Sequence, residues 1–209
     1  ANPNPVCLGE TVNLSVSNNT GATYTWSASA ANAGLVSASI NSTSMIALAA
    51  GTYTISVTQT VTGCISNAAT VQVVIHPLPS TPTAGNVSSV NPTTCLGTDG
   101  SISISGYVAN STYTVDYTKD SAPLSASLMS NGFGIITINN LSAGVYSNFR
   151  ITNTQGCSSG LYNGQVTLTD PPSQGTPIDL VANPDPSCLG ELVNLSVTNE
   201  SGATYTWSV

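Results

Sequence analysis

The sequence predicts an all-β protein of tandem immunoglobulin-like β-sandwich domains, arranged as beads on a string and stapled by disulfides. Apolar and polar residues alternate in short runs, the pattern of strands with one buried face. Clusters of Gly, Asn and Ser separate these runs, and no helical apolar stripe exceeds two turns. About seven short strands in roughly 80 residues are typical of an immunoglobulin-like sandwich.

Each half of the chain supplies its own set of predicted strands. In the first half the alternating runs cover residues 11–17, 22–27, 52–58 and 70–75. In the second half they cover residues 101–105, 112–118, 134–138, 145–152 and 165–169.

One of these runs changes phase. If Tyr146 points into the core, strict alternation would next bury Asn148 and Arg150, whereas the apolar residues are Phe149 and Ile151. A β-bulge inserts one extra residue and shifts the following side chains to the other face. We therefore expect a bulge at residues 147–148.

The last part of the chain repeats its beginning. Residues 182–208 align without a gap on residues 1–27, at an offset of 181 residues and with 6 differences in 27 positions. Self-similarity at a fixed period indicates an array of structural units. The chain is therefore expected to be a window on a longer tandem polypeptide.

The two halves also follow one plan. Cys-Leu-Gly opens each half at Cys7 and Cys95, and an Ala-Gly-x-Tyr motif stands before the closing Cys64 and Cys157. These matched positions predict two bridges, Cys7 with Cys64 and Cys95 with Cys157. Each would close a loop of roughly 60 residues and contribute on the order of 4 kcal/mol.

Cys188, the counterpart of Cys7, is expected to have its partner outside the window. A metal site is the alternative for the cysteines, but its ligands would have to cluster, and the sole histidine, His76, precedes a proline in a linker. No metal ion or cofactor is predicted. Disulfides persist in oxidising surroundings, so the predicted location is extracellular.

The predicted organisation has five parts. They are a sandwich over 1–78, a proline-rich linker over 79–86, a second sandwich over 87–172, a linker over 173–186 and the incomplete start of another copy of the first domain over 187–209. Proline fixes φ, so linkers rich in it are stiff and extended. Two sandwiches in line predict an axial repeat on the order of 70 to 90 Å.

The composition excludes several functions. Charged residues make up 5% of the chain and the net charge is −7, which provides no basic patch for nucleic acid. No run of 18 apolar residues occurs, so no membrane insertion is expected in this segment. With His76 as the only imidazole, no catalytic triad can be assembled, and no enzyme activity is predicted.

Two binding alternatives stay open. Asp99 and Asp116 could share a calcium ion, although the dense oxygen ligands of a calcium loop are missing. Together with Asp120 they could also be read as glycosidase carboxylates, but solvated acids beside turns explain them. Threonine runs and exposed aromatic residues could bind sugars, although Thr on a strand surface needs no ligand.

Two stretches resemble known repeat families. TTCLGTDGSISISG, YTVDY, NNLSAGVYSNFRITNTQGCSS and GQVTLTDPP resemble the SprB-type repeat, while CLGETVNLSVSNNTGATYTW and GTYTISVTQTVTGC resemble the PKD-like or Ig-like repeat. Both repeats occur in large cell-surface adhesins or filaments of Bacteroidota. The second stretch departs from the SprB pattern where ITNTQGC replaces the usual Asp before Asn-Gly-Cys.

The resemblance implies a structural shaft or stalk of a secreted filament or giant adhesin, exported by the type IX route and serving gliding or attachment. The implied partners are neighbouring copies in one long chain, lateral fibre contacts, and surface glycans or other cells. Two alternatives remain open: an accessory, carbohydrate-binding module of a secreted hydrolase, and a strand-donation pilus subunit.

A short motif predicts O-glycosylation at Ser121. Asp120-Ser121-Ala122 resembles the Asp-Ser/Thr-small motif that Bacteroidota glycosylate. The match covers only three residues.

Overall fold

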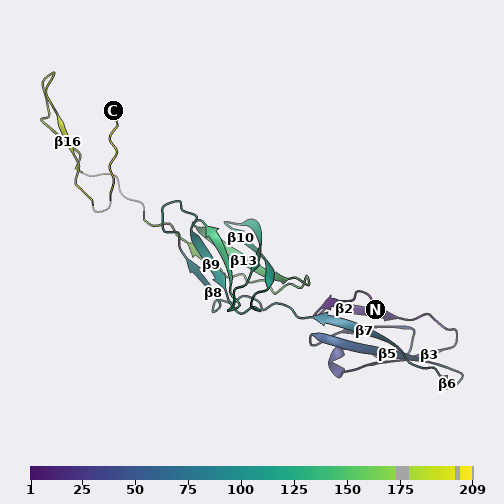
Figure 1. Ribbon diagram of the computed structural model, residues 1–209. Coiled ribbons are helices and arrows are strands. Elements are labelled where there is room, and N and C mark those ends of the chain that lie inside the picture. Colours follow the sequence, from purple (N-terminus) through teal and green to yellow (C-terminus); the bar gives the residue numbers. More distant parts are fainter. Residues whose placement is uncertain (173–178, 201–202, 209) are drawn as a thin grey trace. The chain divides into compact units, whose positions relative to one another are not determined.

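The computed structural model describes residues 1–172, 179–200 and 203–208. By packing, the chain divides into a unit of residues 1–170 and a unit of residues 171–209. The first unit holds two separate hydrophobic cores, one in each predicted sandwich. The fold is all-β and consists of tandem immunoglobulin-like sandwiches (Figure 1).

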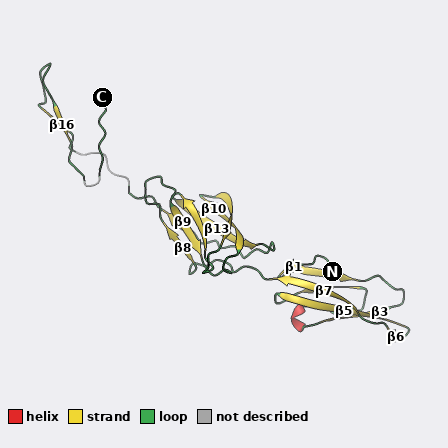
Figure 2. Cartoon of the chain, in the orientation of Figure 1, coloured by secondary structure: helices red, strands yellow, loops and turns green. Residues whose placement is uncertain are grey.

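The described part of the chain contains sixteen strands and one short 3₁₀ turn, η1 (Ala31–Ala33) (Figure 2). No described helix has the length and apolar character to cross a membrane. The strands are β1 (Val6–Cys7), β2 (Thr11–Ser15), β3 (Thr23–Ala28), β4 (Ser42–Ile46), β5 (Gly51–Val61), β6 (Cys64–Ile65), β7 (Ala69–His76), β8 (Val87–Val90), β9 (Gly100–Ile104), β10 (Thr112–Lys119), β11 (Ala122–Met129), β12 (Ile136–Leu141), β13 (Gly144–Asn153), β14 (Val166–Leu168), β15 (Val181–Asn183) and β16 (Asn194–Ser196).

The first sandwich packs β2 and β4 against a sheet of order β1-β7-β5-β3, with β6 extending the tip of β5. The strand β1 runs parallel to β7, whereas the other pairs are antiparallel. Alternate residues of both sheets meet in the core, which is why the period of two in the sequence located these strands. Val12 and Leu14 come from one sheet, and Ile55 and Val73 from the other.

The second sandwich packs a sheet of order β11-β10-β13-β14 against β12-β9-β8. Its core joins Ile102 and Ile136 of the smaller sheet to Val115 and Ile151 of the larger one. The predicted run of residues 134–138 corresponds to β12, which begins two residues later at Ile136.

The predicted bulge in β13 is confirmed. The register between β10 and β13 shifts between Asp116 and Thr118, and Asn148 takes a positive φ of 57°. Tyr146, Phe149 and Ile151 are all buried as a result. One extra residue on β13 thus keeps the apolar side chains on the core face.

The Ala-Gly-x-Tyr motif forms the same hydrogen bond in both sandwiches. The Tyr53 hydroxyl donates to the Ala49 carbonyl and the Tyr146 hydroxyl to the Ser142 carbonyl, each at 2.8 Å. Both tyrosines stand near the start of a long central strand and bond back to the turn before it, as in the tyrosine corner of immunoglobulin-like domains. The motif therefore fixes the turn that leads into β5 and β13.

The second unit reproduces local features of the first residues of the chain. Cys188 N–H donates to the Glu191 carboxylate at 2.8 Å, as Cys7 N–H does to Glu10. β15 lies inside the expected 173–186 linker, so the pairing of this copy begins earlier than the sequence suggested. Residues 173–178 of that linker lie outside the described residues.

Candidate functional site: the disulfide junction

A disulfide between Cys7 and Cys157 joins the two sandwiches of the first unit. The Cα atoms are 5.5 Å apart and the sequence separation is 150 residues. Cys7 ends β1 beside His76 at the end of β7, and Cys157 follows the last residue of β13. The bridge therefore lies beside the linker that connects the sandwiches.

The expected bridge between Cys7 and Cys64 is wrong, because these residues lie at opposite ends of one sheet. β7 carries His76, the partner of Cys7, at the end where Ile75 pairs with Gly51 at the start of β5. Cys64 pairs with Val61 at the other end of this 11-residue strand. At about 3.3 Å per residue the ends are about 33 Å apart, whereas a disulfide needs Cα atoms within about 7 Å.

The expected bridge between Cys95 and Cys157 is wrong for the same reason. Cys95 lies in the loop before Gly100, whose Cα region contacts Leu168, and Leu168 pairs with Gly144 at the start of β13. Cys157 lies beyond the opposite end of β13. Matched cysteine positions therefore mark opposite ends of each sandwich.

The remaining cysteines are exposed. Cys64 lies on the β5–β6 hairpin and Cys95 on the loop between β8 and β9. Cys188 has no disulfide partner among the described residues, and its expected partner outside the window stays a prediction.

Asn153 organises the turn that presents Cys157. Its carboxamide oxygen accepts hydrogen bonds from the backbone N–H of Gln155 at 3.1 Å and of Cys157 at 2.9 Å. Its amide nitrogen donates to the Pro77 carbonyl of the linker at 3.2 Å. Asn therefore fills the turn position in the ITNTQGC segment, and one side chain connects the disulfide loop to the linker.

The linker makes two further hydrogen bonds to the second sandwich. The Tyr107 hydroxyl donates to the Ser80 carbonyl at 3.2 Å, and the Gly160 N–H donates to the Thr81 hydroxyl at 3.0 Å. A stiff linker that is also hydrogen-bonded along its length has few conformations available.

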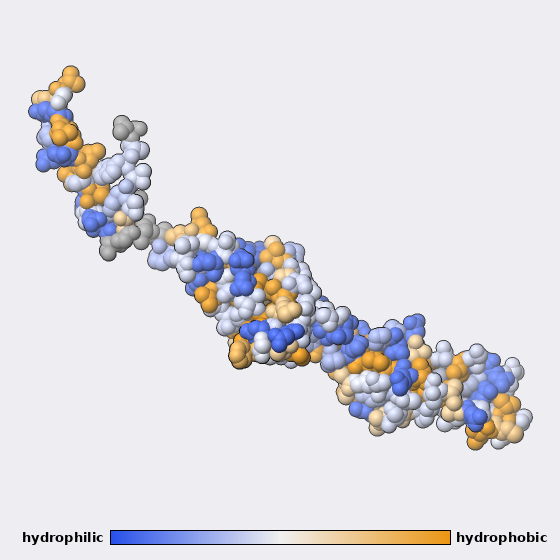
Figure 3. Space-filling model, in the orientation of Figure 1, coloured by the Kyte–Doolittle hydropathy of each residue, from blue (hydrophilic) through white to orange (hydrophobic). Residues whose placement is uncertain are grey.

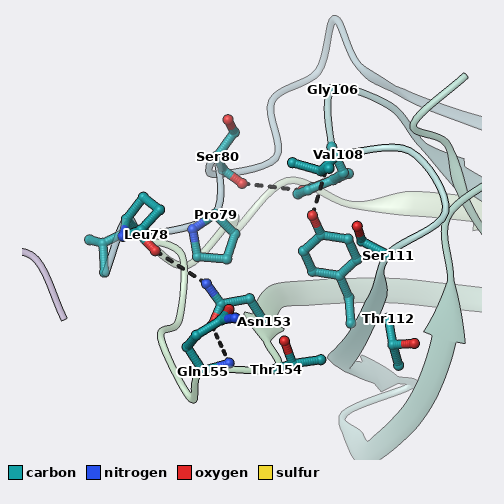
Figure 4. A pocket seen from close by; sticks show the side chains of 13 residues that line it. Leu78, Pro79, Ser80, Gly106, Val108, Ser111, Thr112, Asn153, Thr154 and Gln155 are labelled. Atoms are coloured by element: carbon teal, nitrogen blue, oxygen red, sulfur yellow. Dashed lines mark hydrogen bonds between the residues drawn. The ribbon is translucent and has the colours of Figure 1, made fainter. Parts of the chain in front are cut away.

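A cavity of about 390 Å³ lies where the linker meets the second sandwich (Figure 4). Its lining carries hydroxyl, amide, apolar and phenol groups and no charged side chain. Figure 4 shows Asn153 reaching toward the linker beside Leu78 and Pro79. The lining residues are Pro77, Leu78, Pro79, Ser80, Gly106, Tyr107, Val108, Ser111, Thr112, Tyr113, Asn153, Thr154 and Gln155.

Two tyrosines form one wall of this cavity. The ring centroids of Tyr107 and Tyr113 are 5.2 Å apart with an interplanar angle of 56°. Burial, with a smaller contribution from the neighbouring Tyr113, raises the pKa of Tyr107 to about 12. Both phenols are therefore neutral hydrogen-bonding groups at physiological pH.

The structure does not bring the candidate carboxylates together. Asp99 accepts hydrogen bonds from the Thr93 hydroxyl and N–H, which lower the pKa of its carboxyl group. Asp116 accepts from the Ser125 hydroxyl on β11, and Asp120 from the Val145 N–H. Among the described residues no three His, Cys, Asp or Glu side chains cluster as metal ligands.

Ser121 lies on the two-residue turn between β10 and β11 and is exposed. Asp120 and Ser121 have positive φ values of 48° and 72°, which are typical of a type I′ hairpin turn. The serine hydroxyl is therefore presented on a hairpin tip.

Sequence reasoning missed Asn153 and Thr81 as junction residues. The signal available for Asn153 was its place four residues before Cys157, the spacing of an Asn-led turn. No pattern pointed to Thr81, because its partner Gly160 lies 79 residues away.

No protein-family profile matches the chain, and no curated protein matches its sequence. Several solved structures of tandem domains are similar at low identity. A segment of two fibronectin type III domains from chicken tenascin shares 15% identity with a TM-score of 0.35, covering 75% of this chain and 91% of its own. Domains A168–A170 of titin share 17% identity with a TM-score of 0.37, covering 78% and 61%.

The FN1–FN3 domains of chicken CNTN1 share 12% identity with a TM-score of 0.39, covering 79% of this chain and 63% of their own. All these scores are below 0.5 and describe a coarse likeness in architecture. The chain is therefore a tandem array of immunoglobulin-like β-sandwiches with one disulfide across the junction of the first two.

Proposed function

We propose that the chain is a repeat segment from the shaft of a secreted bacterial cell-surface filament or giant adhesin. The observation that carries the proposal is the Cys7–Cys157 bridge, which joins two successive sandwiches covalently instead of closing each one separately. The hydrogen-bonded linker of residues 77–86 supports the same reading, since both features reduce bending between domains.

The repeat at an offset of 181 residues supports a tandem arrangement. In the second unit Leu195 is 55% exposed, whereas its counterpart Leu14 is 1% exposed in the first sandwich. The apolar face of the second unit thus lacks the strands that cover Leu14, and further chain of the same repeat would supply them. Neighbouring copies of the repeat are the partners we propose.

An extracellular location follows from the bridge, because disulfides are typical of oxidising compartments. We extend this to a cell-surface location and type IX export on the basis of the SprB-like and PKD-like resemblance. Figure 3 shows apolar residues scattered between polar ones on the visible face, as on a surface exposed to solvent.

Electron microscopy of the native material tests the proposal. We expect thin fibres with an axial repeat on the order of 70 to 90 Å. Intact mass of the secreted chain separates the alternatives: many times 21.1 kDa supports one tandem polypeptide, while a value near it supports a polymer of strand-donating subunits. Compact particles, or a catalytic domain in the same polypeptide, would contradict the shaft.

We also propose that Ser121 carries an O-glycan. Its hairpin-tip position makes the hydroxyl accessible, and a sugar would add hydration to surroundings poor in charge. Glycopeptide mass spectrometry of the native protein should find a mass addition at Ser121 that is lost in Ser121→Ala. An unmodified Ser121 in all native peptides would remove the idea.

A further inference from the structure

The first residues of the chain run along the whole of β7. Ala1 lines the same cavity as Ala69, the residue that begins β7. Cys7 pairs with His76, the residue that ends it, and the two strands are parallel (Figure 2). Residues 1–7 therefore extend along the first sandwich from one end to the other.

The residues after Cys157 run along β13 in the same way. Ser158 forms a bridge with Thr152 and Tyr162 with Phe149. Further on, Val166 pairs with Tyr146 and Leu168 with Gly144, the first residue of β13. Residues 158–168 therefore extend along the second sandwich from the junction to its far end.

The disulfide joins these two extended segments directly. The shortest covalent path from Ala1 to Asp170 runs through residues 1–7, the bridge and residues 157–170. Residues 8–156, which supply nearly all of both cores, form a closed loop attached to this path. Force applied along the chain is therefore carried past both cores once this short path is taut.

We propose that the Cys7–Cys157 bridge makes this path a tension line that shields both sandwiches from extension. Strand pairing already holds much of the path extended at about 3.3 Å per residue, close to the maximum of about 3.6 Å, so little slack remains. Opening either core releases no chain length, because the bridge holds the ends of the loop together. The first unit should behave as a nearly inextensible link.

The role of this tension line in the organism rests on the proposed shaft function. If Cys188 were bridged as Cys7 is, about 30 residues of each repeat, those from Cys157 to Cys188, would carry the load, with a taut length on the order of 100 Å. That length is close to the axial repeat expected for two folded sandwiches. A shaft built this way keeps its length when a domain opens.

Single-molecule stretching of the full chain between handles at its two ends tests the proposal. In the oxidised protein we expect extension from residues 171–209 and the short slack of the path, without a large unfolding step. After reduction with a phosphine, the sandwiches should open and release additional length on the order of 500 Å, set by the bridge's sequence separation of 150.

Two cysteine variants make the test specific. Cys7→Ser should release the same length without reductant, and it is preferred because Cys157 is fully buried and its replacement also perturbs packing. Cys64→Ser is the matched control: Cys64 is exposed and lies outside the bridge, so the oxidised variant should stretch like the parent chain.

Release of that length by the oxidised chain, with the bridge verified in the same sample, would overturn the tension line. Absence of the bridge in oxidised protein would overturn it as well. Neither result depends on fibres, so failure of the shaft proposal in electron microscopy remains distinguishable from failure of this one.

Discussion

At the residue scale, a few polar groups in the cores and the junction fix local geometry. The hydroxyls of Tyr53 and Tyr146 are hydrogen-bonded beneath the strands that they begin, and both side chains are buried. Because a buried carbonyl that loses its donor is left unsatisfied, such groups contribute more to stability than exposed polar residues do.

We predict that Tyr53→Phe and Tyr146→Phe each lower the free energy of unfolding by about 0.5 to 1.5 kcal/mol, because each removes one net hydrogen bond. Urea titration followed by fluorescence or circular dichroism measures the loss. Tyr117→Phe is the matched control, since the described structure gives the hydroxyl of this buried tyrosine no hydrogen bond. Equal losses at all three positions would contradict the role of the corner.

The phenol of Tyr107 provides a prediction about alkaline pH. The pKa of Tyr107 is raised from 10.0 to about 12 in the folded protein, so the neutral form is favoured by folding. Its contribution to stability is therefore complete below pH 10 and is lost as the pH rises toward 12. Absorbance at alkaline pH should show one late phenolate transition that Tyr107→Phe removes, and a parent titration without it would refute the shift.

At the scale of the element, the bulge in β13 decides which side chains reach the second core. Asn148 adopts a left-handed conformation that Asn tolerates and β-branched residues do not. Without the extra residue at this point, Phe149 would leave the core.

We predict that Asn148→Val destabilises the second sandwich by about 1 to 2 kcal/mol, because Val is strained at positive φ. Asn148→Gly should be close to neutral, since glycine adopts this conformation freely. Chemical denaturation of the two variants compares them directly. If Gly were as destabilising as Val, backbone conformation would not be the cause.

At the scale of the whole molecule, one covalent bond couples two hydrophobic cores. The bridge constrains 150 residues of sequence separation, so it restricts the unfolded chain strongly. In the chain-entropy description a loop of this length is worth on the order of 5 kcal/mol.

We predict that non-reducing peptide mapping recovers Cys7 linked to Cys157, and that reduction lowers the unfolding midpoint of both sandwiches together. Cys7→Ser should reproduce the loss, on the order of 5 kcal/mol, while Cys64→Ser should leave the midpoint unchanged. Calorimetry of the oxidised and reduced protein measures the difference. Recovery of a Cys7–Cys64 peptide instead would contradict the structure.

The sequence by itself determined the fold class and the local geometry of this protein. Period-two burial located strands such as β5 and β10, and the misplaced apolar phase of Phe149 predicted the bulge. These features depend on neighbours a few residues apart, so their physical causes are written within short stretches of chain. Strands β4 and β11 escaped detection because each has few buried side chains to mark a period.

Only the tertiary structure decided the cysteine partners and the junction. Equal spacing of Cys64 and Cys157 from their tyrosines made them look like the closing ends of two local loops. A long strand carries such a residue about 30 Å from where it starts, and linear spacing does not record which end of a sandwich that is. Cys157 therefore lies beside Cys7 of the other sandwich, where the linker brings the two ends together.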